Sequence, residues 1–178
     1  MTNNKNGAGK QPAIAVGLDD ARKELDLVLG FFQRVDAKLS VVLGIDLGML
    51  GLLSSKAPQM SEITGTTWCL VALFLMLCGL SLFQLYRGSF PNLDGGQSSL
   101  VFFREIAKRR EVEFVDAFTA LTADALTKDI LCQVWRNSEI LVKKFDNLKR
   151  AYICMALSVP PWVVALIYFV RAGARDAG

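Results

Sequence analysis

The stretch from Gly95 to Ser99 has the residue types that can hold a phosphate group. It precedes a predicted helix, and free backbone N–H groups and the helix dipole attract anions at such a position. Arg104 lies about one turn into that helix, where its guanidinium can add a charge-assisted hydrogen bond to the same anion. Ser99 is equally suited to cap the helix by accepting a backbone hydrogen bond. The pattern therefore predicts either an anion site or a plain helix cap.

Three more polar residues, Gln133, Ser138 and Lys144, lie close to the apolar stripe of a second, longer predicted helix. Their amide, hydroxyl and ammonium groups can hydrogen-bond a base and a phosphate, and they can equally link neighbouring helices. The sequence leaves both interpretations open. The candidate ligand-binding residues are Ser99, Arg104, Gln133, Ser138 and Lys144.

A basic stripe on the longer helix consists of Arg136, Lys143 and Arg150, which repeat every seven residues. Glu139 precedes Lys143 by four residues, and Asp146 precedes Arg150 by four. This spacing favours ion pairs along a helix surface. We therefore interpret the stripe as a solvated face whose charges are mostly neutralised within the helix.

Asp46 lies in the middle of the apolar segment 39–53. A charged residue at such a position costs about 2.5–3.5 kcal/mol on insertion scales and is a functional candidate by default. Gly44, Gly48 and Gly51 share the opposite face of the same predicted helix, and small residues at this spacing let helices pack closely. Either Asp46 faces a pore or a second interface while the glycines pack, or it pairs with a Ser, Thr or Gln of the next apolar segment.

Enzyme chemistry finds no support in the residues. Histidine is absent, and we find no nucleophile with a base, no carboxylate dyad and no metal-ligand cluster. The cysteines form no CxxC pair, and three lie in hydrophobic segments, which argues against a disulfide framework or a zinc site. We expect a protein that is not an enzyme and has no catalytic residue, bound metal or cofactor.

Two uncharged segments, 66–85 and 151–170, are long enough as helices to cross a bilayer. The segment 39–53 is shorter, but an amphipathic pattern leads straight into it, with apolar residues at Leu25, Val28, Phe32 and Val35. Hydrophobic residues make up 52% of the chain, and the mean hydropathy is +0.35. The sequence predicts an all-α membrane protein with about three transmembrane helices and a small cytoplasmic helical unit continuous with the spans.

The chain divides into seven segments on this interpretation. They are a disordered tail (1–17), a cytoplasmic amphipathic helix (18–38), a first span (39–55), a second span (66–86), a cytoplasmic helical unit (87–150), a third span (151–170) and a tail (171–178).

Charge distribution predicts the orientation. Residues 1–38 hold six Lys and Arg and 87–150 hold eleven, whereas 54–65 hold one. The positive-inside rule places the two charged blocks, and hence the N-terminus, in the cytoplasm. A third crossing then puts the C-terminal tail outside, unless a hinge at Pro160 and Pro161 makes the last segment re-entrant. Each charged block is nearly balanced, so the net charge of +3 does not argue for a nucleic-acid-binding patch, and we expect no nucleic-acid partner.

The cytoplasmic unit is predicted to contain a helix from Leu100 to about Arg110. Thr119 or Thr122 can cap the next helix, which meets no breaker before Pro160 and so runs from the cytoplasm into the third span. A unit of about sixty residues cannot bury a stable core alone. We expect it to pack on the N-terminal helix or on copies of itself.

Several short patterns resemble the transmembrane effectors of Pycsar, a bacterial anti-phage system in which a pyrimidine cyclase makes a cyclic mononucleotide that triggers a membrane-damaging partner. The matching residues are Val35-Asp36-Ala37-Lys38 leading into Leu43-Gly44-Ile45-Asp46, Pro91 followed by Ser99-Leu100-Val101-Phe102-Phe103, and Asp129-Ile130-Leu131-Cys132-Gln133-Val134-Trp135 with Ser138, Lys144-Phe145 and Leu148. The resemblance extends from about residue 20 to 170.

The resemblance implies a multi-pass protein of the bacterial inner membrane that responds to cyclic UMP or cyclic CMP and impairs the membrane, causing abortive infection. Its partners would be the nucleotide made by a cognate pyrimidine cyclase, the lipid bilayer and other copies of itself in a homo-oligomer. No cyclic-nucleotide-binding β-barrel is recognisable, so the ligand site would be helical. Two other functions are compatible with the residues, a constitutive small ion channel or transporter and a membrane-anchored scaffold subunit.

Overall fold

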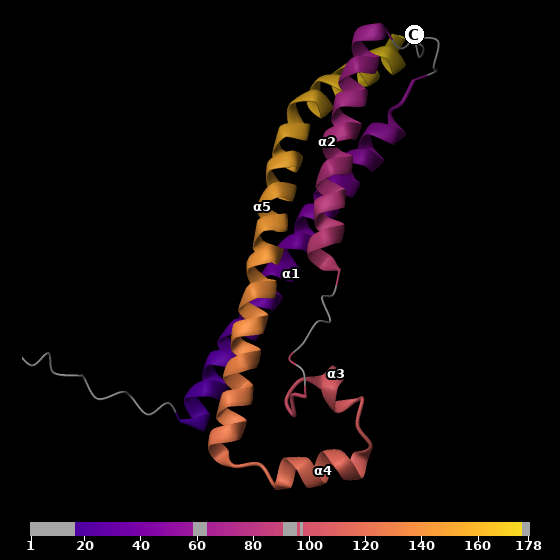
Figure 1. The fold of residues 1–178 in the computed structure, drawn as a ribbon. Helices are drawn as coiled ribbons and strands as arrows, with labels where there is room; N and C mark the ends of the chain where they lie inside the picture. Colours follow the sequence, from indigo (N-terminus) through magenta and orange to yellow (C-terminus); the bar gives the residue numbers. More distant parts are fainter. Residues whose placement is uncertain (1–16, 59–63, 91–95, 97, 176–178) are drawn as a thin grey trace, which may run out of the picture.

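Three long helices dominate the computed structural model, which describes residues 17–58, 64–90, 96 and 98–175. α1 (Leu18–Ser55), α2 (Gly65–Ser89) and α5 (Ala123–Arg175) form an elongated bundle, with α3 (Phe103–Ile106) and α4 (Glu111–Thr119) at one end (Figure 1). The described residues contain no strand, and α1, α2 and α5 are long and apolar enough to cross a membrane. The predicted fold class is therefore confirmed.

α1 joins the predicted amphipathic stretch to the first apolar segment in one uninterrupted helix. At its start the Asp20 carboxylate accepts a hydrogen bond from the backbone N–H of Gly17 at 3.2 Å, which satisfies one of the N–H groups that a helix leaves free. The predicted tail that precedes Gly17 lies outside the described residues. α2 begins after Thr64, whose side chain accepts from the backbone N–H of Thr67 at 3.4 Å.

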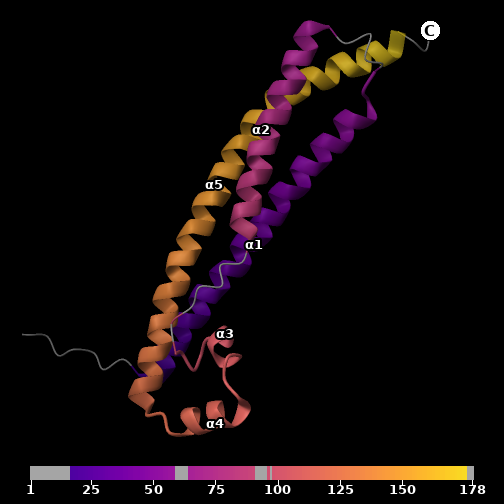
Figure 2. The same ribbon diagram turned by 45° about the vertical axis from the view of Figure 1, so that its right-hand side comes forward.

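α5 joins the last helix of the predicted cytoplasmic unit to the third apolar segment in 53 residues. Of the two predicted caps, Thr122 is the one used, because its hydroxyl accepts from the backbone N–H of Ala125 at 3.3 Å. The helix continues through Pro160 and Pro161 and bends in its last third (Figure 2), as expected where proline removes backbone hydrogen bonds. It does not turn back, so the structure lacks the re-entrant hinge.

The predicted helix from Leu100 to Arg110 is wrong. Only the four residues of α3 are helical there, and a separate helix, α4, starts after Arg110. The Asp129 carboxylate of α5 accepts a hydrogen bond from the backbone N–H of Leu100 at 2.8 Å. Arg110 and Glu113 form an ion pair at the start of α4. The backbone N–H of Arg110 also donates to Glu113 Oε2 at 3.3 Å and not to a carbonyl one turn back, so a new helix starts there.

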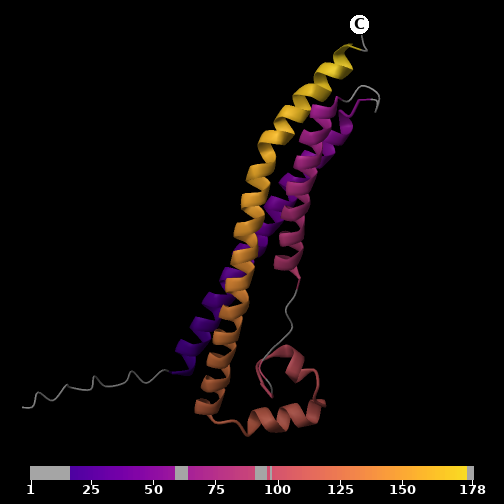
Figure 3. The same cartoon turned by 45° about the horizontal axis from the view of Figure 1, so that its top comes forward.

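The core follows the line where the long helices meet, and α2 and α5 run side by side along it (Figure 3). One cluster lies toward the α3 and α4 end and contains Val35, Leu39, Val42, Leu85, Leu141, Leu148, Ala151 and Met155. A second cluster lies toward the other end and contains Met49, Leu53, Phe74, Cys78, Ala165 and Phe169. No residue of α3 or α4 is buried, so the bundle holds the core.

Gly88 sits where α2 packs against both other long helices. A Cβ at this position would lie 3.3 Å from the Cβ of Asn147 and 3.3 Å from a Cδ of Leu39. These contacts are tighter than ordinary van der Waals packing, so the missing side chain sets the spacing of the helices.

We expect Gly88→Val to destabilise the bundle by about 1–3 kcal/mol, because the added methyl groups overpack a closed contact. Gly79→Val is the matched control, since a Cβ there meets nothing within 4 Å and the change in helix propensity is the same. Thermal unfolding of the two variants in detergent measures the difference. Equal stabilities would show that Gly88 does not set the helix spacing.

Candidate functional site

A polar contact joins the three long helices at the level of Asp46. Ser81 Oγ of α2 lies 2.6 Å from Asp46 Oδ2 of α1 and 3.2 Å from the carbonyl oxygen of Ala151 in α5. Asp46 and Ser81 are both fully buried. Of the two interpretations of Asp46, the structure therefore supports the second, in which Asp46 pairs with a serine of the next apolar segment.

The glycine face of α1, formed by Gly44, Gly48 and Gly51, is exposed. A Cβ at any of these positions would have no atom within 4 Å among the described residues. No helix of the described chain packs on this face, so close helix packing there stays a prediction about another chain.

Ser99 and Gln133 are the two candidate ligand-binding residues that meet, and both are buried. Ser99 Oγ accepts hydrogen bonds from the backbone N–H groups of Val101 at 3.1 Å and Phe102 at 3.0 Å. It also accepts from Gln133 Nε2 at 3.2 Å. Ser99 thus closes a turn and links it to α5. It does not cap a helix as one sequence interpretation predicted, because α3 begins after Phe102 and has no side-chain cap.

Ser98, the residue before this turn, has a φ of 62° in the left-handed region, which costs a residue with a side chain some energy. Its backbone N–H donates to Glu105 Oε2 at 3.2 Å, and its carbonyl accepts from Arg109 Nη2 at 2.8 Å. The Lys108 ammonium beside Glu105, followed by the Ser98 N–H, holds the pKa of that carboxyl below its usual value. Side chains on both sides therefore keep the turn in its strained form. Gly95 and Gln97 lie outside the described residues.

The other three candidates lie elsewhere. Arg104 is exposed on α3, and Ser138 Oγ donates to the carbonyl of Val134 within α5 at 2.8 Å. Lys144 Nζ donates to Asp36 Oδ1 at 2.6 Å and so links α5 to α1.

The five candidates do not form one site. Gln133 and Lys144 are eleven residues apart on α5, a separation of roughly 16 Å along a helix axis. A small ligand cannot bridge that distance, so the role of the five residues in binding stays a prediction.

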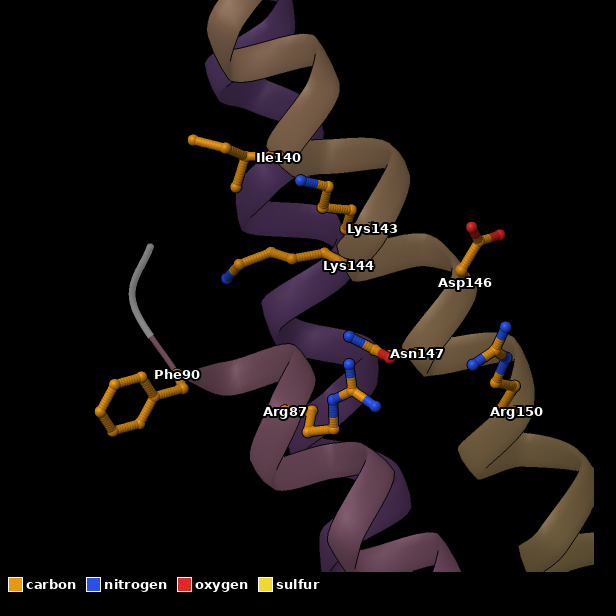
Figure 4. Close-up of a pocket in the computed structure, with 8 residues that line it drawn as sticks. All are labelled: Arg87, Phe90, Ile140, Lys143, Lys144, Asp146, Asn147 and Arg150. Atoms are coloured by element: carbon orange, nitrogen blue, oxygen red, sulfur yellow. The ribbon is translucent and has the colours of Figure 1, made fainter. Parts of the chain in front are cut away.

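A cavity of about 300 Å³, here called the basic pocket, lies where the end of α2 packs against α5 (Figure 4). Its lining combines four cations, one carboxylate, one amide and two apolar side chains. The lining residues are Arg87, Phe90, Ile140, Lys143, Lys144, Asp146, Asn147 and Arg150.

The ion pairs predicted within α5 for Lys143 and Arg150, two cations of the pocket, do not form. Glu139 pairs with Arg136 at 3.0 Å and not with Lys143. Across the part of the chain that the structure describes, neither Lys143 nor Arg150 forms an ion pair, and Asp146 forms none with Arg150. The predicted ion pairs are therefore wrong for these positions, whereas the predicted exposure of the stripe is confirmed at Lys143 and Arg150.

Arg87 brings a further cation to the pocket from α2. Its guanidinium lies over the Phe83 ring, 5.9 Å from the ring centroid, and it has no carboxylate partner within the described ranges. Only Lys144, among the four lining cations, is neutralised, by Asp36. Sequence reasoning missed Arg87 and Phe90 because they belong to the end of a different apolar helix.

The basic pocket is chemically suited to a small planar anion. Lys and Arg form strong, charge-assisted hydrogen bonds to phosphate oxygens, and the Asn147 amide offers both a donor and an acceptor. Phe90 is exposed and lies against Tyr86, with 5.5 Å between the ring centroids. An aromatic ring beside a group of cations can contact a flat ligand while the cations hold its charge.

Comparison with known proteins gives two matches. The family model of the Pycsar effector protein domain matches residues 20–171. The Pycsar effector protein GmPycTM of Gulbenkiania mobilis is 30% identical over 87 residues, which cover 44% of this chain and 44% of that protein. No solved structure matches. Because the family model covers most of the chain, this protein belongs to the Pycsar effector family.

Proposed function

We propose that this chain is an anti-phage defence effector that binds a cyclic pyrimidine mononucleotide, cyclic UMP or cyclic CMP, in the basic pocket and then impairs the bacterial inner membrane. The nucleotide would come from a cognate pyrimidine cyclase. Membership of the family and the three apolar helices support this proposal. The observation that carries the choice of site is the group of unpaired cations at the α2–α5 junction.

Charge and size favour such a ligand. A cyclic mononucleotide carries one negative charge on its phosphodiester and a flat base. The pocket offers three cations without carboxylate partners in the described chain, Arg87, Lys143 and Arg150. Its volume of about 300 Å³ lies at the lower end of the range for small-molecule sites.

We assign the phosphate to the cations and the base to Phe90 and Asn147. Lys143 and Arg150 both come from α5, whereas Arg87 comes from α2 and Phe90 directly follows that helix (Figure 4). A ligand held by both helices binds differently when their spacing changes. Such differential binding is the requirement for a ligand to shift a conformational equilibrium.

Membrane damage by this protein requires several copies of the chain. Three helices in one chain pack against one another around buried side chains and leave no room for a water-filled path. The exposed glycine face of α1 is the surface we propose for contact between copies in a homo-oligomer. The inner membrane, with a cytoplasmic N-terminus, fits the positive charge of residues 1–38 and 87–150.

We expect Lys143→Gln and Arg150→Gln each to weaken binding of cyclic UMP or cyclic CMP by about tenfold or more, because a hydrogen bond to a charged group contributes about 1.5–3 kcal/mol. Lys149→Gln is the matched control, since Lys149 is exposed on the same helix but does not line the pocket. Calorimetric titration of the full chain in nanodiscs of neutral lipid measures the affinities. Equal affinities of Lys143→Gln and Lys149→Gln would place the ligand elsewhere.

In cells, we expect growth arrest and uptake of a membrane-impermeant dye only when the chain is produced together with an active pyrimidine cyclase. A catalytically inactive cyclase is the control. Dye uptake without any cyclase would favour a constitutive channel or transporter. Intact membranes with the active cyclase would favour a scaffold subunit.

A further inference from the structure

The contact between Asp46, Ser81 and Ala151 has too few hydrogens if Asp46 is ionised. Ser81 Oγ lies within hydrogen-bond distance of Asp46 Oδ2, at 2.6 Å, and of the Ala151 carbonyl oxygen, at 3.2 Å. A carboxylate and a carbonyl are both acceptors only, and a hydroxyl has a single hydrogen to donate. One of the two short contacts would therefore join two lone pairs without a hydrogen between them.

One additional proton on Asp46 completes a series of hydrogen bonds between the three helices. The acid O–H of Asp46 then donates to Ser81 Oγ, and the Ser81 hydroxyl donates to the carbonyl oxygen of Ala151. A separation of 2.6 Å lies within the range for an O–H···O hydrogen bond. The resulting series of hydrogen bonds runs from α1 through α2 to α5, and each of its two contacts contains one hydrogen.

The surroundings of Asp46 also fit a neutral acid. Its second oxygen, Oδ1, is buried without a hydrogen-bond partner among the described residues. An ionised carboxylate in such a place would lose its hydration with nothing in return. Within the described part of the chain, no Lys or Arg forms an ion pair with Asp46. The titratable group that faces it from α2 is the buried Cys78 thiol, and α5 contributes the Ala151 carbonyl.

We propose that Asp46 is a proton-binding site, occupied in the arrangement described here, and that this proton holds α1 to α2 and α5. When the three helices separate and water reaches the site, the Asp46 O–H bond breaks and the proton passes to a water molecule. A carboxylate then remains on α1. The proposal does not depend on which ligand the basic pocket binds.

Infrared spectroscopy of the full chain in nanodiscs at neutral pH tests the proposal. A protonated carboxylic acid has a C=O stretching band that a carboxylate lacks. We expect this band in the unmodified protein and its loss in Asp46→Asn, which keeps the shape of the side chain. Asp36→Asn is the matched control, because Asp36 lies on the same helix but is half exposed and paired with Lys144. Its substitution should leave the band unchanged.

Ser81→Ala gives a second measurement that does not remove the acid. It takes away the acceptor of the Asp46 hydrogen, so we expect the band to persist and to move to higher frequency. Absence of the band from the unmodified protein would overturn the proposal. A band that survives Asp46→Asn would also overturn it, and so would a band whose frequency is unchanged in Ser81→Ala.

Discussion

The need to satisfy backbone hydrogen bonds inside hydrocarbon is the constraint on which the rest of this structure depends. Only helices and closed barrels meet it within a bilayer, and this chain uses three long helices. α5 is one continuous helix across the junction between its polar and apolar halves. Because the helix is continuous, the basic pocket and the apolar core are built on the same rigid element.

The same constraint explains the polar residues within the core. A buried polar group without a partner is costly where no water can replace that partner. Asp46 Oδ2, Ser81 Oγ and the Ala151 carbonyl come from three different helices and lie within hydrogen-bond distance of one another through Ser81. They therefore fix the relative register of α1, α2 and α5, which apolar packing alone specifies weakly. Trp162 adds a second link, because its Nε1 donates to the carbonyl of Met49 at 2.9 Å.

Features fixed by local spacing and hydropathy could be predicted from the sequence, and features fixed by contacts between distant segments could not. The three apolar helices and the Thr122 cap follow from local pattern. In place of the helix expected after Leu100, the structure has a turn that α5 holds through Asp129, which accepts from the Leu100 N–H, and Gln133, which donates to Ser99 Oγ. The basic pocket was missed for the same reason, because Arg87 and the α5 residues that line it are far apart in the sequence and meet only where the helices pack. The family itself was recognisable from short residue patterns.

The basic pocket and the Asp46 contact both involve one short piece of α2. Arg87 lines a pocket in which three of the four cations have no carboxylate partner among the described residues. Ser81 contacts Asp46, which forms no ion pair within the same ranges. Six residues separate Arg87 from Ser81, roughly 9 Å along the helix. A helix of this length transmits displacement with little bending. In the proposed mechanism, an anion that draws Arg87 toward α5 therefore also moves Ser81 relative to Asp46. If the proposed site binds its ligand, α2 itself would couple that binding to loosening of the three-helix contact.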